Sequence, residues 1–180
     1  MTVVDNLYSG HRWAVPPTAD FHQLDAGDEP AMSSLLRQQR SDAVIHFAGH
    51  IVVPESIADP AKYYRNNVVA SLNLIRACCA SGVRHFIFSS SAAVYGDPEQ
   101  VPVAEHHPTI PINPYGRTKL ITEWTLRDMA LGDRQGSAGL KYVALRYFNV
   151  AGASLDGTLG QATPEATHLI KVACETATGQ

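Results

Sequence analysis

The feature of this sequence that most limits its fold is an alternation between short apolar runs and longer segments with helical spacing. The short runs lie at residues 2–5, 21–25, 43–48, 83–89 and 142–148. They are apolar on both faces and rich in β-branched and aromatic residues. Runs of this kind are typical of strands in a covered parallel sheet.

Segments in which apolar residues recur every three or four positions separate these runs. They predict helices at residues 30–39, 60–81, 113–131 and 164–178. Gly82 is placed to end the second helix. Asn113 is a candidate N-cap, with Pro114 at the first helical position. Strands that alternate with helices predict an α/β fold with a parallel sheet.

Composition narrows the class of protein. The 180 residues suffice for one domain with a core, and 45 % hydrophobic with 17 % charged residues is typical of a globular chain. The net charge is −3 without a basic stripe, which argues against nucleic acid or an anionic membrane as partner. No apolar run reaches the ~18 residues that a membrane helix needs, and the N-terminus does not resemble a signal peptide.

Cysteine and histidine usage points away from disulfides and metals. The three cysteines include the adjacent pair Cys78 and Cys79, which favours a reducing cytoplasm over a disulfide framework. The eight histidines lack the paired spacing of a zinc site, so we expect no metal.

Polar or small residues cluster where the predicted strands end. These are Asp5 and Asn6, Asp25, Ala48 and Gly49, Ser89 to Ser91, and Asn149. Each alone is an ordinary turn composition. Ligands of open parallel sheets bind beyond the carboxyl ends of the strands, so the pattern indicates a binding site there. An acidic residue such as Asp5 at the end of a dinucleotide-fold strand accepts ribose hydroxyls and favours NAD over NADP, although Arg12 lies nearby.

The segment from Tyr115 to Lys119 is the strongest catalytic signal. On a helix these two residues are one turn apart on the same face, a spacing that is also common on ordinary amphipathic helices. A lysine ammonium, a cationic nicotinamide ring and the helix N-terminus all lower the pKa of a tyrosine, and we expect this of Tyr115. A serine at a neighbouring strand end can bridge the phenol and a substrate hydroxyl.

These motifs together resemble the extended short-chain dehydrogenase/reductase family, and within it the UDP-glucose 4-epimerases. The matching segments are VDNL at 4–7, VIHFAG at 44–49, YYRNNV at 63–68, FIFSSSAAVYG at 86–96, NPYGRTK at 113–119 and LRYFN at 145–149. The resemblance covers nearly the whole chain. It implies a Rossmann-like, doubly wound parallel sheet.

The resemblance also implies roles for individual residues. Tyr115 matches the catalytic base, Lys119 its pKa tuner and Ser91 the bridging serine. Cofactor contacts are implied for Tyr115 and Lys119 as well as Asp5, Asn6, Asp25, Ala26, Phe47, Ala48, Gly49, Asn66, Ser89 and Phe148. Contacts with the sugar nucleotide are implied for Ser91, Tyr115, Asn149 and His168.

The implied reaction interconverts UDP-glucose and UDP-galactose through a 4-keto intermediate with NAD, in nucleotide-sugar metabolism. Ser91-Ala92-Ala93-Val94 lacks the acid pair of the related dehydratases, which favours epimerisation. His50 and Ile51 depart from epimerases that carry a lysine after the Phe-Ala-Gly segment. The alternatives are a related NAD-dependent UDP-sugar epimerase or decarboxylase, or a non-catalytic remnant of the fold.

Both ends of the family pattern are missing from this chain. A glycine-rich turn is expected about 20 residues before the ribose-binding acid, yet Met1 lies four residues before Asp5. We therefore expect a sheet without its first strand–helix unit, with exposed edges on the two neighbouring strands. Residues 1–150 would be a partial NAD-binding domain and 151–180 the start of a UDP-sugar-binding region. We expect the isolated chain to be inactive and the full-length protein to be a possible homodimer.

Overall fold

The computed structural model describes residues 1–132, 139–163 and 168–179. They form two compact units, one of Met1–Gln23 with Asn149–Gln180 and one of Leu24–Phe148.

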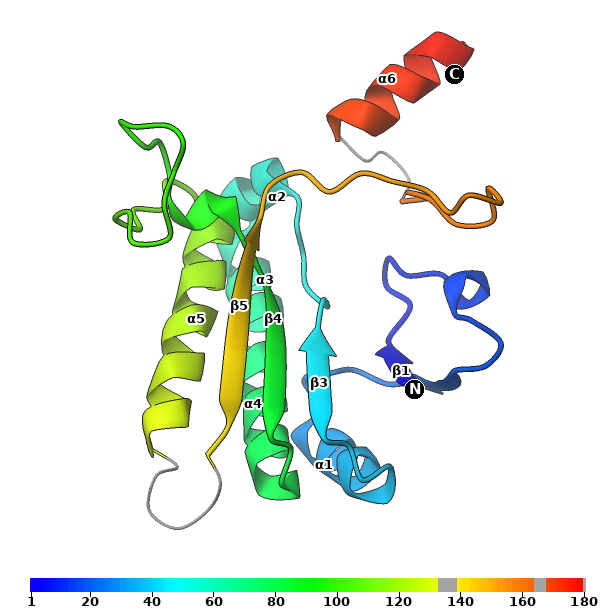
Figure 1. Cartoon of the computed structure of the whole chain (residues 1–180), viewed down its shortest axis with the longest axis vertical. Helices are drawn as coiled ribbons and strands as arrows, with labels where there is room; N and C mark the ends of the chain where they lie inside the picture. Colours follow the sequence, from blue (N-terminus) through cyan, green and yellow to red (C-terminus); the bar gives the residue numbers. More distant parts are fainter. Residues whose placement is uncertain (133–138, 164–167, 180) are drawn as a thin grey trace. The chain divides into compact units, whose positions relative to one another are not determined.

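The larger unit is built on a three-stranded parallel sheet in the order β3 (Ala43–His46), β4 (His85–Ser91) and β5 (Lys141–Tyr147) (Figure 1). One face of this sheet packs against α4 (Ala70–Ser81) and α5 (Pro114–Gly132). His46 of β3 is hydrogen-bonded to Ser71 of α4 at 2.8 Å, and the Lys119 ammonium of α5 lies 5.1 Å from the ring centre of Phe88. Phe86, Phe88 and Leu126 are fully buried between these layers.

The opposite face of the same sheet is largely uncovered. Ile45, Ile87 and Val143 are register partners and form one apolar row across the three strands. Ile45 is 56 % exposed and Val143 is 53 % exposed. Strands covered on both faces were expected from the apolar runs, and among the described residues only one face carries helices.

The helix predicted at residues 60–81 is continuous but contains a wider turn. It comprises α3 (Pro60–Tyr63), the π-helix η2 (Tyr64–Val69) and α4. Gly82 ends it in the left-handed conformation at φ 76°, as predicted. α1 (Glu29–Gln38) packs on α4, and Asp28 caps α1 by accepting the Ala31 N–H at 3.1 Å. In the larger unit two short helices were not predicted, α2 (Val53–Ala58) and the 3₁₀ turn η3 (Ala92–Val94).

The smaller unit contains the parallel pair β1 (Thr2–Asp5) and β2 (Asp20–Gln23), the 3₁₀ turn η1 (Arg12–Ala14) and α6 (Leu169–Thr178). The helix predicted at 164–178 begins at Leu169. Residues 164–167 lie outside the described residues.

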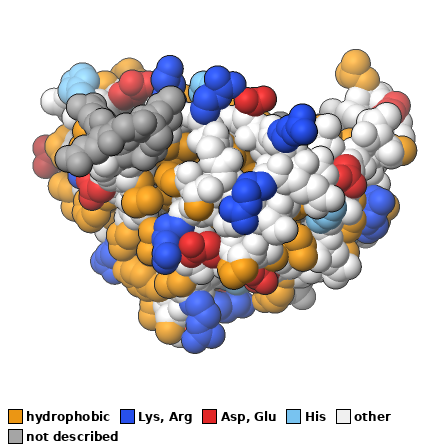
Figure 2. Space-filling view, turned by 90° about the horizontal axis from the view of Figure 1, so that it is seen from below, with side chains coloured by type: hydrophobic (Ala, Val, Ile, Leu, Met, Phe, Trp, Pro, Cys, Tyr) orange, Lys and Arg blue, Asp and Glu red, His pale blue; other side chains and the backbone are white. Residues whose placement is uncertain are grey.

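Each unit has a parallel sheet of its own, in the order β1-β2 in the smaller unit and β3-β4-β5 in the larger one. The α/β class with parallel strands is therefore confirmed, and among the described residues β1 pairs with β2 alone and β3 with β4 alone, so each has the unpaired edge that was expected. No helix in the described part of the chain is both long and apolar enough to cross a membrane. Basic and acidic side chains are interspersed on the face drawn in Figure 2.

Candidate active site

The start of α5 is fixed by side chains that accept its free N–H groups. Asn113 accepts the Gly116 N–H at 2.8 Å, which confirms the predicted N-cap. Pro114 has no N–H to satisfy. The Tyr115 N–H is donated to the hydroxyl of Ser56, a fully buried residue of α2, at 3.2 Å. Tyr115 thus occupies the second position of a well-capped helix.

The Tyr115 side chain reaches the carboxyl end of β4, where it is hydrogen-bonded to Ser91. The Ser91 Oγ also accepts the Ala93 N–H at 3.1 Å, which orients the hydroxyl. Burial raises the pKa of the Tyr115 phenol, and the Ser91 hydrogen bond acts in the opposite direction. The sequence predicted a lowered pKa, and this differs because desolvation is the larger effect in the chain alone.

Lys119 lies one turn further along α5 and is buried. Its Nζ donates to the carbonyl oxygen of Ser89 at 2.9 Å and lies 5.8 Å from the centre of the Tyr115 ring. Desolvation lowers the pKa of Lys119 to about 8. Ser89, Ser91, Tyr115 and Lys119, predicted from separate motifs, therefore converge at the end of β4.

The loop after β3 passes close to this cluster. Phe47 is 64 % exposed and Ala48 is also exposed. Gly49 has a φ of +155°, and a Cβ on it would lie 3.1 Å from the Asn67 Oδ1 and 3.7 Å from the Lys119 Nζ. The positive φ favours glycine at this position, and the close approach to the Asn67 side chain adds to this preference.

Asn67 ties this loop to the helix that carries Tyr115. Its Oδ1 accepts the His50 N–H at 2.8 Å and the Asn66 Nδ2 at 3.0 Å, and its Nδ2 donates to the His50 carbonyl oxygen at 2.9 Å. The Nδ2 also donates to the Thr118 hydroxyl at 3.2 Å. All four hydrogen-bonding positions of this buried amide are therefore used.

A pocket of about 500 Å³ opens beside the loop and the π-helix. Asp25 accepts the Gly27 N–H at 2.7 Å, and Ala26 lies in the same turn. Asn73 of α4 donates to the Gly27 carbonyl oxygen at 2.9 Å and holds this turn in place. The pocket brings together two predicted cofactor residues, Asp25 and Asn66, and it is lined by Asp25, Gly27, Asp28, His50, Lys62, Arg65, Asn66, Val69, Ala70 and Asn73.

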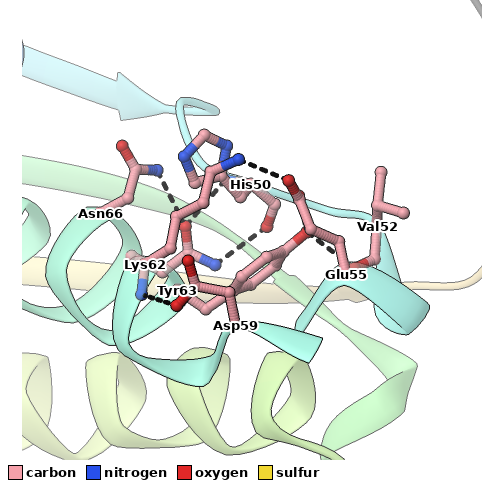
Figure 3. Close-up of polar contacts among 8 residues, drawn as sticks. His50, Val52, Glu55, Asp59, Lys62, Tyr63 and Asn66 are labelled. Carbon is pink, nitrogen blue, oxygen red and sulfur yellow. Dashed lines mark hydrogen bonds and ion pairs between the residues drawn. The ribbon is translucent and has the colours of Figure 1, made fainter. Parts of the chain in front are cut away.

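A polar cluster braces the far side of this loop (Figure 3). The fully buried Tyr63 places its hydroxyl 2.7 Å from the Val52 carbonyl oxygen and 2.8 Å from the Glu55 carboxylate. Glu55 also forms an ion pair with Lys62. The His50 ring lies 5.5 Å from the Tyr63 ring, and burial is the largest cause of the lowered pKa of His50.

A second polar network supports β4 and β5 from the α5 side. Arg146 of β5 forms two hydrogen bonds with the Glu123 carboxylate of α5, at 3.0 and 2.7 Å. Ser90 donates to the same carboxylate. Arg146 also donates to the Tyr95 hydroxyl at 2.7 Å and shares a cavity of about 390 Å³ with the exposed Phe148.

Four predicted site residues belong to the smaller unit. Asp5 ends β1 and accepts the Leu7 N–H at 2.6 Å, while Asn6 accepts the Tyr8 N–H at 3.0 Å. Asn149 is exposed. His168 precedes α6 and is hydrogen-bonded to Gln161 at 2.6 Å.

Sequence reasoning did not identify Ser56, Asn67, Lys62 or Arg65 as site residues. Asn67 left no signal in the apolar periodicity, because its side chain is buried through hydrogen bonds. Ser56 left none, since its partner Tyr115 is 59 residues away in the sequence.

The chain is similar to known proteins over nearly its whole length. Residues 1–179 match the model of the NAD dependent epimerase/dehydratase family. The UDP-glucose 4-epimerase of Azospirillum brasilense is 51 % identical over 98 % of this chain and 49 % of its own length. That of Lactobacillus helveticus is 49 % identical over 93 % of this chain and 49 % of its own. The chain spans about half the length of the curated relatives it matches.

Solved structures give the same result. The UDP-glucose 4-epimerase of Brucella ovis in complex with NAD superposes with a TM-score of 0.93 at 47 % identity, covering 99 % of this chain and 53 % of that one. The UDP-Glc/GlcNAc 4-epimerase of Campylobacter jejuni has a TM-score of 0.82 at 46 % identity, covering 99 % and 54 %. The match to the family model covers nearly every residue, so this chain belongs to the NAD dependent epimerase/dehydratase family.

Proposed function

We propose that the protein interconverts UDP-glucose and UDP-galactose through a 4-keto sugar, with NAD as cofactor. The observation that carries the proposal is the convergence of Tyr115, Ser91 and Lys119 at the carboxyl end of β4. Relatives that are named UDP-glucose 4-epimerases over this same region support it.

The residues around the larger pocket fit a dinucleotide. NAD presents ribose hydroxyls, which a carboxylate such as Asp25 accepts, and phosphate oxygens, which attract cations such as Lys62 and Arg65. Asn66 adds an amide at the same pocket. We further propose that NAD contacts the other residues predicted to bind it, which are Asp5, Asn6, Ala26, Phe47, Ala48, Gly49, Ser89 and Phe148.

When bound, NAD would accept and return the hydride of the sugar, and its nicotinamide ring would add a positive charge near the phenol. Tyr115 would take the proton of the sugar 4-hydroxyl, with Ser91 bridging the two oxygens. With a pKa of about 8, Lys119 is mainly cationic at neutral pH, so its charge favours the phenolate. Asn149 and His168 would contact the sugar nucleotide.

The test is Tyr115→Phe in the protein expressed from its complete gene, assayed for conversion of UDP-galactose. Removing the general base should lower turnover by about 10²–10⁴-fold while bound NAD stays unchanged. Tyr142→Phe is the matched control, because Tyr142 lies near the amino end of β5, away from the site. Turnover of Tyr115→Phe at the level of this control would show that Tyr115 is not the base.

A second substrate is worth assaying because the Campylobacter jejuni neighbour is named for both UDP-Glc and GlcNAc. Conversion of UDP-N-acetylglucosamine alone would replace the proposed substrate but not the reaction. Decarboxylation of UDP-glucuronate would replace the reaction. Absence of both NAD binding and turnover would identify a non-catalytic remnant.

Three further expectations of the sequence stay predictions. Residues 1–150 would belong to the NAD-binding domain and 151–180 would begin the UDP-sugar-binding region. The full-length protein would be a homodimer through the helix that carries Tyr115 and the one that starts at Pro60. Its location would be the cytoplasm.

A further inference from the structure

The N–H of Tyr115 depends on a side chain from outside its own helix. The first N–H groups of an α-helix lack acceptors within the helix. In α5, Pro114 has none to offer and Gly116 is served by Asn113 at 2.8 Å. Tyr115 is served by Ser56 of α2 at 3.2 Å.

Ser56 is itself held in one orientation. It is 0 % exposed, and its hydroxyl donates to the Val53 carbonyl oxygen at 2.6 Å. A serine hydroxyl has one proton, and Ser56 donates it to the Val53 carbonyl oxygen. The lone pairs of the Ser56 oxygen therefore remain to accept the Tyr115 N–H. Ser56 therefore acts as an oriented acceptor.

The helix that carries Ser56 packs on α5 and is also anchored to a second helix. The Tyr63 hydroxyl contacts the Val52 carbonyl oxygen and the Glu55 carboxylate, and Lys62 pairs with Glu55 (Figure 3). These contacts attach α2 to the long helix that starts at Pro60. The Ser56 oxygen that accepts the Tyr115 N–H therefore belongs to a segment that several polar contacts hold in place.

We infer that Ser56 is a positioning residue that sets where the Tyr115 phenol lies relative to Ser91. The inference rests on the proposed role of Tyr115 as base. Without the Ser56 oxygen, the Tyr115 N–H has lost its acceptor in a partly buried place, and the first turn of α5 must move to satisfy it. A shift of about 1 Å in a reacting group is enough to cost a large factor in rate.

The experiment compares Ser56→Ala with Ser71→Ala in the protein expressed from its complete gene. Ser71 is a matched control, because it is 2 % exposed and loses one side-chain hydrogen bond, to His46 at 2.8 Å. Two readouts are measured. One is kcat and KM for UDP-galactose, and the other is fluorine NMR of a ring-fluorinated tyrosine placed at position 115, which needs no turnover.

We expect Ser56→Ala to lower kcat by about tenfold or more with little change in KM, and to shift the fluorine resonance. Ser71→Ala should change neither. If both variants keep the wild-type kcat and resonance, Ser56 does not position Tyr115. A wild type without epimerase activity would refute the proposed function, while the resonance shift would still decide the role of Ser56. Ser56→Cys, which has a weaker acceptor of similar size, carries the test if Ser56→Ala does not fold.

Discussion

Single residues in this structure combine burial with a polar or charged function. Lys119 is buried and donates to a backbone carbonyl, Asn67 has all its hydrogen bonds made, and His46 is buried against Phe86 and Phe88. Desolvation lowers the pKa of His46 to about 3, and the charge of Lys119 acts in the same direction. His46 is therefore neutral throughout the physiological range.

Because the buried His46 is neutral, we predict that the folded chain loses stability in acid. Between about pH 6.5 and pH 3 the unfolded chain binds a proton at this residue that the folded chain does not, so stability is lost as the pH falls through this window. The loss over the whole window is about 5 kcal/mol, at about 1.4 kcal/mol per pH unit. Denaturant unfolding from pH 7 to pH 4 should show a smaller loss in His46→Gln. The exposed His85, changed to Gln, should behave like the wild type, and parallel curves for all three proteins would contradict the prediction.

At the scale of the elements, the first turn of α5 packs closely against η3. A Cβ on Gly116 would lie 2.6 Å from the Ala93 carbonyl oxygen of η3 and 3.0 Å from Pro111. At the other end of the same helix, a Cβ on Gly132 would meet nothing within 4 Å. The helix that carries Tyr115 can therefore approach η3 only because residue 116 has no side chain.

This contrast predicts opposite effects for the same substitution at the two ends of α5. Gly116→Ala should cost about 1–3 kcal/mol of unfolding free energy, because the added methyl group meets backbone rather than a movable side chain. Gly132→Ala should be neutral or stabilising by up to about 1 kcal/mol, because alanine favours the helix. Denaturant unfolding measures both. Equal effects would mean that α5 can move away from η3 without cost.

The sequence predicted the elements better than the contacts between them. The strands were placed within about two residues because their apolar, β-branched runs are local signals. In the helix from Pro60, the apolar residues that recur every three or four positions are Tyr64, Val68, Leu72, Ile75 and Cys79. The buried side instead contains Tyr63, Asn67, Ser71, Leu74, Ile75 and Cys78. It is offset because Asn67 and Ser71 are buried through hydrogen bonds, which apolar periodicity cannot reveal.

The residues of the candidate site likewise divide into those that the sequence predicted and those that only the structure revealed. Ser91, Tyr115 and Lys119 followed from motifs and strand ends. Ser56 lies in a six-residue helix whose sequence, Val-Pro-Glu-Ser-Ile-Ala, has too few turns for a periodic pattern. Its contact with Tyr115 arises from the packing of α2 on α5 and so required the structure.

At the scale of the whole molecule, both sheets end in an unpaired strand, and the larger sheet has one uncovered apolar face. Ile45 and Val143 lie on that face with Ile87 between them. Exposed apolar faces and unpaired strand edges both promote association.

The 180-residue chain should therefore self-associate when isolated. A lysine on the exposed face opposes this, so Val143→Lys should make the monomer the main species in size-exclusion chromatography with light scattering. Ile57→Lys is the matched control, because Ile57 is an exposed aliphatic residue on α2 rather than on the sheet. A wild-type chain that is monomeric at high concentration would contradict the prediction.

The π-helix η2 has a consequence for the register of the long helix that contains it. An ordinary α-helix advances by about 100° per residue, so an extra residue in one turn changes the angular phase between the segments on either side. Before η2, Tyr63 points toward Val52 and Glu55; after it, α4 packs against α1. Deleting one residue from η2 would rotate one set of contacts away from its partners by about a quarter turn. The π-helical turn therefore sets the rotation between the two segments of the helix, so that one helix contributes contacts to both the site and the core.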